Sequence, residues 1–240
     1  MSAAPAPRDG GARYPSPMSA APPPIVFYFD FISPYAYLAW TQLHALAARH
    51  AREVVAVPVV FGAILDARGQ KGPAEIPAKR AYLFKDCTRL AHRFGVPLVP
   101  PPSHPFNPLL ALRAASLPVP APAHRAFLDA LFAETWAGGR GVTEPAVIAA
   151  AADSAGLDGD QVVRDATLPE TKALLRRHTD EALAAGAFGV PTMVVGDELF
   201  WGVDSLAHLD VFLDGRDPVT PAILARWADL PATAARRAVR

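Results

Sequence analysis

The sequence predicts an α/β protein, in which a β-α-β unit near the N-terminus and a β-hairpin followed by a helix near the C-terminus enclose a long helical segment. Short aromatic and β-branched runs, which are typical of buried strands, occur within residues 25–61 and again within 190–201. Between roughly 62 and 185, helical patterns alternate with proline-rich breaks, and strand-like runs are scarce. These observations predict a central mixed four-stranded sheet with a large all-helical insertion.

Composition excludes several classes of function. The 240 residues are 51% hydrophobic and 19% charged, which suits a large buried core in a compact chain with two lobes. The 23 Lys and Arg residues balance the 23 Asp and Glu residues, so no net basic field attracts nucleic acid or anionic lipid over long range. No uninterrupted apolar run reaches about 18 residues, and no membrane span is predicted.

Cysteine and histidine usage narrows the chemistry further. The single cysteine, Cys87, excludes an intramolecular disulfide and any C-x-x-C redox or metal motif, which fits a reducing cytoplasm. Because Cys87 lies within a predicted helix, we interpret it as a small buried hydrophobe and not as a nucleophile. None of the seven His residues is paired at i, i+4 with carboxylate partners on a predicted helix, so no metal site is expected.

The N-terminal elements follow from local signals. Residues 1–24 are rich in Ala, Pro and Gly and are expected to form a flexible, disordered tail. The apolar run 25–32 is the expected first strand. Ser33 then supplies an N-cap hydroxyl and Pro34 fits the first helical position, so the first helix begins there. A second strand at about 54–61 completes β-α-β, whose crossover makes the two strands parallel.

Residues 63–185 are expected to form a helical insertion domain between the two parts of a sheet domain, 25–62 and 186–215. Capping side chains, prolines in first turns and a terminal glycine mark the helices. The expected helices lie at 77–94, ending at Gly95; at 108–115, capped by Asn107; at 122–136; at 144–155, capped by Thr143; and at 170–185.

The C-terminal elements are a hairpin and a helix. Two short apolar runs at 190–195 and 198–201 surround Gly196-Asp197, which is a hairpin signal. A helix at about 204–213 follows. Residues 216–240 are expected to form a C-terminal extension with one more short helix.

Ser33 is the strongest local candidate for chemistry. A Ser hydroxyl at a helix N-terminus lies among unpaired backbone N–H groups and at the positive end of the helix dipole, where an anion such as a thiolate is stabilised. A plain N-cap is the alternative, because Ser is among the commonest capping residues. The position alone does not decide between the two.

Val190-Pro191, at the start of the hairpin, is the second candidate. If this peptide bond is cis, the backbone N–H and C=O of Val190 face outward and can pair with an extended, peptide-like ligand. A trans proline at the start of a strand is the alternative, since cis is the minority state of X-Pro bonds. The sequence leaves both open.

Five segments in order resemble the 2-hydroxychromene-2-carboxylate isomerases and their relatives, the kappa-class glutathione transferases. The segments are 29–38 (FDFISPYAYL), 69–73 with 77–79 (GQKGP and PAK), 107–109 (NPL), 188–192 (FGVPT) and 200–204 (FWGVD). The resemblance runs from about residue 25 to 213. It implies a thioredoxin-like fold with a DsbA-type helical insertion, and glutathione as the cofactor.

The resemblance also assigns roles to residues. Ser33 would donate a hydrogen bond to the glutathione sulfur and hold it as the thiolate. The implied glutathione-binding residues are Ser33, Pro34, Gln70, Lys79, Val190, Pro191 and Asp204. The candidates for contact with a planar aromatic substrate or its carboxylate are Tyr35, Lys71, Arg80, Asn107 and Trp201. Structural roles remain open for several of them: Asp204 and Asn107 as helix caps, and Lys79 as a solvated charge.

The implied function is glutathione-dependent cis–trans isomerisation of 2-hydroxychromene-2-carboxylate or a similar aromatic enone acid, in aromatic catabolism, by reversible thiolate addition. A kappa-type transferase and a non-catalytic peptide- or glutathione-binding module are the alternatives. Two positions depart from the family pattern: Ser205 stands where Arg is frequent, and Gln70 where Asn is common. A homodimer is expected on base rates.

Overall fold

The computed structural model describes residues 22–228, 230, 231, 233 and 234, so residues 1–21 of the expected tail lie outside it. A four-stranded sheet with the order β2-β1-β3-β4 forms its centre. The strands are β1 (Ile25–Phe29), β2 (Val54–Pro58), β3 (Thr192–Val195) and β4 (Glu198–Trp201). β1 runs parallel to β2 and antiparallel to β3, and β3 and β4 form the predicted hairpin. The predicted mixed sheet is confirmed.

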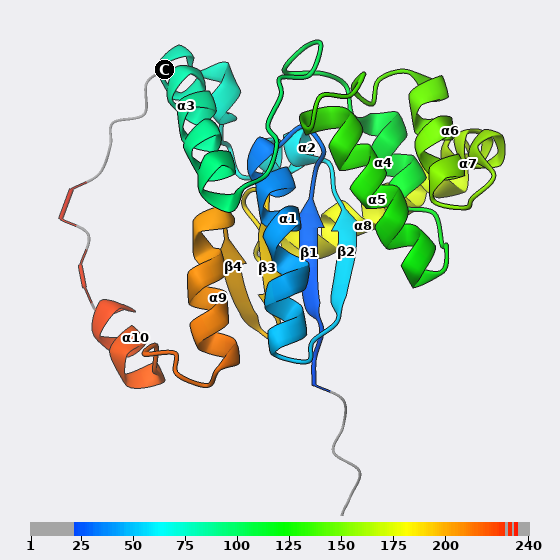
Figure 1. Ribbon diagram of the computed structural model, residues 1–240. Coiled ribbons are helices and arrows are strands. Elements are labelled where there is room, and N and C mark those ends of the chain that lie inside the picture. Colours follow the sequence, from blue (N-terminus) through cyan, green and yellow to red (C-terminus); the bar gives the residue numbers. More distant parts are fainter. Residues whose placement is uncertain (1–21, 229, 232, 235–240) are drawn as a thin grey trace, which may run out of the picture.

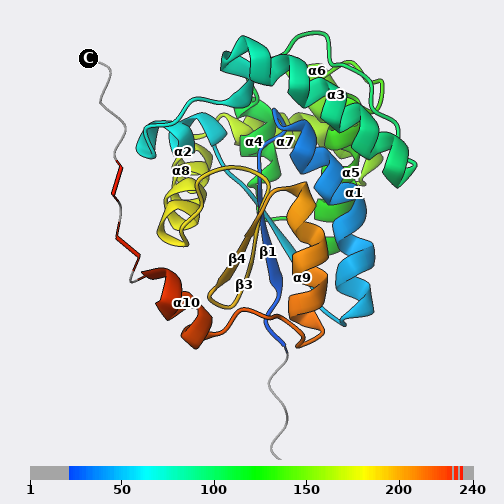
Figure 2. The same ribbon diagram turned by 90° about the vertical axis from the view of Figure 1, so that its left-hand side faces the viewer.

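Helices cover both faces of this sheet. Figure 2 shows α1 (Pro34–Arg49) and α9 (Leu206–Leu213) on one face, and α2 (Phe61–Ala67) and α8 (Pro169–Ala184) on the other. Between α2 and α8 the chain forms the helical insertion, most of which lies over the upper end of the sheet in Figure 1. Its remaining elements are η1 (Pro73–Glu75), α3 (Pro77–Phe94), α4 (Leu109–Ala115), α5 (Ala121–Trp136), α6 (Pro145–Ser154) and α7 (Gly159–Ala166). The 3₁₀ turn η2 (Val203–Ser205) precedes α9, and α10 (Pro221–Ala228) follows it.

The structure corrects the prediction around the second strand. The strand predicted at 54–61 ends at Pro58, and α2 begins at Phe61, where the apolar sequence indicated more strand. Tertiary partners explain the change. The Val60 N–H donates to Thr179 Oγ1 at 3.1 Å, and the Phe61 N–H donates to Asp30 Oδ2 at 3.0 Å. These two acceptors fix the start of α2, a helix the prediction did not include.

Two helix starts also differ from expectation, and a third agrees with it. Helix α7 was not predicted, although Asp158 caps it by accepting the Gln161 N–H at 2.9 Å. Thr143 was the expected cap of α6, but the N-cap residue is Glu144, whose side chain makes no capping hydrogen bond. Asn107 does accept a backbone N–H, that of Leu109, at 3.0 Å.

One aromatic cluster joins the sheet to the helical insertion. Phe29 and Phe31 lie at the end of β1, and the ring of Phe132 from α5 lies 5.4 and 4.9 Å from theirs. The Trp40 ring of α1 is 5.9 Å from the same Phe132 ring. All four side chains are nearly inaccessible to solvent, so sheet and insertion share a hydrophobic core.

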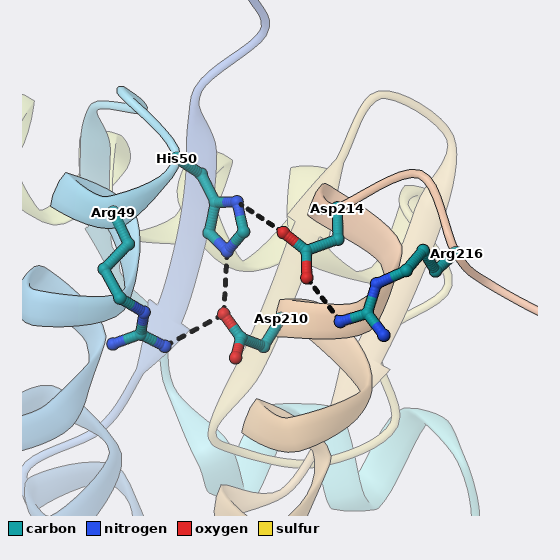
Figure 3. A network of polar contacts seen from close by, with 5 residues as sticks. All are labelled: Arg49, His50, Asp210, Asp214 and Arg216. Carbon is teal, nitrogen blue, oxygen red and sulfur yellow. Dashed lines mark hydrogen bonds and ion pairs between the residues drawn. The ribbon is translucent and has the colours of Figure 1, made fainter.

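A polar network ties the C-terminal end of α1 to α9 (Figure 3). Asp210 accepts hydrogen bonds from His50 Nε2 at 2.7 Å and from Arg49 Nη2 at 2.9 Å, and these two contacts lower the pKa of Asp210. His50 Nδ1 lies 3.6 Å from Asp214, which also pairs with Arg216. The end of α1 opposite Ser33 is therefore attached to its neighbouring helix.

No helix among the described residues combines the length and the apolar character that crossing a membrane requires.

Candidate functional site

Ser33 is the N-cap of α1, as predicted. Its Oγ accepts the Ala36 N–H at 3.2 Å, and its side chain is largely buried, with the residue 7% exposed. Among the described residues the Ser33 hydroxyl donates no hydrogen bond. The hydroxyl can therefore donate to an anion while the positive end of the helix dipole stabilises the same charge.

Asp30 supports the turn that carries Ser33, a role the sequence analysis did not anticipate. Its Oδ1 accepts the Ile32 N–H and its Oδ2 accepts the Phe61 N–H, both at 3.0 Å. Burial raises the pKa of this carboxyl to about 7, against the opposing effect of the two hydrogen bonds. Asp30 thus links the β1–α1 turn to the first turn of α2. An acidic residue inside an aromatic strand sequence was the available signal.

The Val190-Pro191 peptide bond is cis. Pro191 O accepts the Gly202 N–H at 2.9 Å, which joins this loop to the end of β4. Within the described part of the chain, neither the N–H nor the C=O of Val190 pairs with another backbone group. The Val190 backbone is thus available to an extended ligand, as the cis alternative requires.

A cavity of about 440 Å³ opens beside Ser33 and Val190. Its walls are mainly apolar and come from α2, α3, the loop before α4 and the start of α4; they include Phe61, Leu65, Leu83, Phe106 and Leu109. Its polar lining consists of Asp30, Ser33, Glu75, His104 and Asn107. Among the described residues no Lys or Arg lines this cavity. Such walls suit an aromatic molecule that meets only a few polar groups.

His104 is a second residue that the sequence analysis missed. Its Nε2 lies 3.0 Å from Ile32 O, and its buried Nδ1 has no hydrogen-bond partner among the described residues. Burial lowers the pKa of His104, so the neutral imidazole donates its Nε2–H to this carbonyl. The contact attaches the loop before α4 to the residue that precedes Ser33.

The structure brings four of the predicted site residues together at this cavity: Ser33, Pro34, Asn107 and Val190. Asn107 also accepts the Leu109 N–H at the start of α4, which is its structural role, and its contact with a substrate stays a prediction. Gln70, Lys71 and Lys79 do not line the cavity; they lie exposed in the segment around η1 and at the start of α3.

The other predicted residues lie outside this cavity. The Arg80 guanidinium lies 5.4 Å from the Phe84 ring centre and lines an adjacent cavity of about 400 Å³, which shares Pro34 and His104 with the first. The Tyr35 hydroxyl donates to Asp86 Oδ2 at 2.9 Å.

Trp201 and Asp204 lie beyond the cis-proline loop. The Trp201 ring packs 5.0 Å from that of Phe188 and stays half exposed. Asp204 lies in η2, two residues after Gly202, whose N–H binds Pro191 O. Asp204 faces a groove formed with α1 and α3, which also includes Arg93.

Three features together define a DsbA-like thioredoxin protein. They are the order of the strands, the capped N-terminus of α1 beside a cis-proline loop, and the helical insertion. The family model of the DsbA-like thioredoxin domain matches residues 24–214. The 2-hydroxychromene-2-carboxylate isomerase of Sphingobium xenophagum is 32% identical over 193 residues, covering 79% of this chain and 97% of that protein.

Human glutathione S-transferase kappa 1 is 26% identical over 226 residues, covering 87% of this chain and 100% of that protein. A solved structure of 2-hydroxychromene-2-carboxylate isomerase is similar with a TM-score of 0.72 and 25% identity, covering 87% of this chain and 99% of that chain. The chain belongs to the 2-hydroxychromene-2-carboxylate isomerase family, within the DsbA-like thioredoxin domains.

Proposed function

We propose that this protein is a glutathione-dependent cis–trans isomerase that acts on 2-hydroxychromene-2-carboxylate or a similar aromatic enone acid in aromatic catabolism. One observation carries the proposal: the Ser33 hydroxyl at the N-terminus of α1 shares a cavity with the unpaired backbone of Val190. A hydrogen-bond donor for a thiolate thus lies beside a backbone segment that can pair with a peptide. The names of the relatives support the same reading.

Two groups at the cavity, the Ser33 hydroxyl and the Val190 backbone, fit the sulfur and the peptide backbone of glutathione. Glutathione would supply a thiolate that adds reversibly to the conjugated double bond of the enone, which permits rotation before the bond is restored. Ser33 would donate its hydrogen bond to the sulfur, and the Val190 backbone would pair with that of the tripeptide.

Three charged and polar side chains that lie outside the cavity lining would hold the two ends of the tripeptide. We assign Lys79 to a carboxylate and Gln70 to the tripeptide from the side of the insertion, and Asp204 to its ammonium group. Pro34 and Pro191 would form apolar contacts on either side of the sulfur. These five assignments, besides those of Ser33 and Val190, rest on the family resemblance, and each can be tested by a single substitution.

A kappa-type glutathione transferase is the second candidate, because the cavity has no Lys or Arg among its described lining residues. Such walls suit an uncharged electrophile at least as well as an acid. The substrate contacts assigned to Tyr35, Lys71, Arg80, Asn107 and Trp201 remain proposals, and of these Asn107 lines the cavity. A homodimer and a cytoplasmic location are likewise proposed.

Ultraviolet spectroscopy of the purified protein with glutathione and 2-hydroxychromene-2-carboxylate tests the proposal. An isomerase gives a glutathione-dependent spectral change while total free thiol stays constant. Consumption of free thiol would favour the transferase instead. Absence of any glutathione-dependent change with this substrate and with uncharged aryl electrophiles would refute both activities and leave a binding module.

Ser33→Ala tests the role of the hydroxyl. We expect the variant to retain most of its glutathione affinity but to lose thiolate absorbance in the complex, and turnover to fall about 100-fold, as for loss of one preorganised donor. Asp158→Ala is the matched control, because it also removes a helix cap, costing about 1 kcal/mol of stability, but at α7. Equal thiolate formation in wild type and Ser33→Ala would remove Ser33 from the mechanism.

A further inference from the structure

Gly62 lies in the first turn of α2 and lines the cavity beside Ser33. A Cβ atom built on it would meet no heavy atom of the protein within 4 Å. Its φ lies outside the left-handed region, so an L-residue can adopt its backbone conformation. Glycine is also an unfavourable residue in a helix. Neither the backbone nor the packing of the chain therefore requires glycine here.

Every other glycine in the described part of the chain has a structural reason. Most adopt positive φ, as Gly95 does with φ 68° at the end of α3. The remainder would place a Cβ against the protein: at Gly189 it would lie 2.5 Å from Trp201 Nε1, and at Gly159 it would lie 2.3 Å from Ala149 O. At Gly72 the nearest atom is Glu75 Oε1 at 3.0 Å. Gly62 is the exception: it is exposed, a Cβ there would meet open space, and it lines the cavity.

A flexible hinge does not explain Gly62. The residues on its N-terminal side are fixed, because the Val60 N–H donates to Thr179 and the Phe61 N–H donates to Asp30. Val60 O accepts the Ile64 N–H at 3.2 Å, so the turn that contains Gly62 is closed. What glycine provides here is bare backbone at the wall of a cavity.

The surroundings of that space indicate what occupies it. Leu65 follows Gly62 by three residues and therefore lies on the same face of α2, and it lines the cavity too. Leu83 and Phe106 contribute further apolar wall from α3 and the loop before α4. A flat apolar group can lie against backbone that has no side chain and gain contact with these residues.

We propose that the aromatic ring of the second substrate packs on the backbone of Gly62, and that Gly62 sets the size of ring that the site admits. This inference rests on the proposed function, since glutathione would fill the part of the cavity next to Ser33 and Val190. A side chain at residue 62 would occupy the space of the ring and leave the glutathione contacts intact.

Glutathione derivatives test this without relying on turnover. Titration calorimetry measures the affinity of S-methylglutathione and S-(1-naphthylmethyl)glutathione for wild type, Gly62→Ala and Gly62→Val. We expect Gly62→Val to lower the affinity for the naphthyl derivative by about 10-fold or more, and Gly62→Ala to lower it less. The affinity for S-methylglutathione should change less than about 2-fold in both variants. Ala63→Val is the control, because it adds the same side chain to an exposed neighbour outside the cavity lining.

Stability provides a second measurement. Gly62→Ala should keep or raise Tm, by roughly 1–3 °C, because it reduces the entropy of the unfolded chain. Ring affinity falls in that same variant, so a misfolded protein cannot produce the expected result.

Three outcomes overturn the inference. Unchanged affinity of Gly62→Val for the naphthyl derivative would show that the ring lies elsewhere. An equal loss for both derivatives would place Gly62 in the glutathione subsite. Failure of wild type to bind either derivative would refute glutathione binding itself, and with it the proposed function, which distinguishes that failure from the other two.

Discussion

At the scale of single residues, the site depends on groups that meet only in the folded chain. Ser33, Val190 and Asn107 could be placed in it from the sequence, because a helix cap, a Val-Pro step and family strings are local signals. Asp30 and His104 could not be placed there from the sequence, since each has a hydrogen-bond partner that lies far away along the chain. The Asp30 carboxyl, for example, accepts a backbone N–H from Phe61, 31 residues away.

Asp30 makes stability depend on pH. Its folded-state pKa of about 7 lies above its unfolded value of about 4, so the folded protein binds the extra proton between these values. This stabilising contribution is fully present below about pH 4 and is lost as the pH rises through about 7. Urea unfolding of wild type should show a fall of up to about 4 kcal/mol across this range from this group.

Asp30→Asn should remove that pH dependence. At pH 4.5 the variant is expected to be less stable than wild type, because its amide N–H₂ must face the N–H of Ile32 or Phe61. The difference should narrow or reverse by pH 8. Asp158→Asn is the control, since its exposed carboxyl also accepts a backbone N–H. The same pH slope in Asp30→Asn and wild type would contradict the assignment.

At the scale of elements, the β1–α1 turn is held by the helical insertion. Trp136 at the end of α5 donates its Nε1–H to Phe31 O at 2.8 Å, and His104 binds the next carbonyl, Ile32 O. Two segments of the insertion thus hold the two carbonyls before Ser33. The strands and longer helices were predictable from their periodicity and caps. The start of α2 was not, because acceptors on Asp30 and Thr179 override an apolar run.

Trp136→Phe should loosen this turn. The variant leaves Phe31 O without its buried donor, and we expect a loss of about 1–3 kcal/mol in urea unfolding together with weaker thiolate absorbance when glutathione is bound. Trp40→Phe is the matched control, because Trp40 Nε1 also donates across helices, to Asp129 Oδ1 at 2.6 Å, without touching the turn. Thiolate absorbance lost equally in both variants would mean that the turn has no special role.

At the scale of the whole molecule, the division into a sheet domain and an insertion domain at 63–185 stays a prediction. The hydrophobic core runs across that boundary, because Phe132 of the insertion packs among Phe29, Phe31 and Trp40. Sequence patterns identify which residues are apolar but not which segments pack together in one core. We therefore expect sheet and insertion to unfold as one cooperative unit.

Phe132→Ala tests that expectation. Removing this buried ring should cost about 3–5 kcal/mol in denaturant unfolding. Hydrogen exchange measured on peptides from β1 and from α6 should show the same decrease in protection for both. Phe212→Ala is the control, because Phe212 is only partly buried at the edge of the core, against Phe200, and should cost less. A decrease confined to α6 would indicate that the insertion unfolds alone.

The burial of Cys87 affects how well the polypeptide resists alkylation and oxidation by reactive molecules. Burial raises the pKa of this thiol to about 12, and it is the single cysteine of the chain. An electrophile or oxidant that reaches the cavity meets the Ser33 hydroxyl and, among the described lining residues, no cysteine. If the reactive thiol is that of glutathione, as we propose, alkylation or sulfur oxidation falls on a replaceable small molecule and the polypeptide is spared.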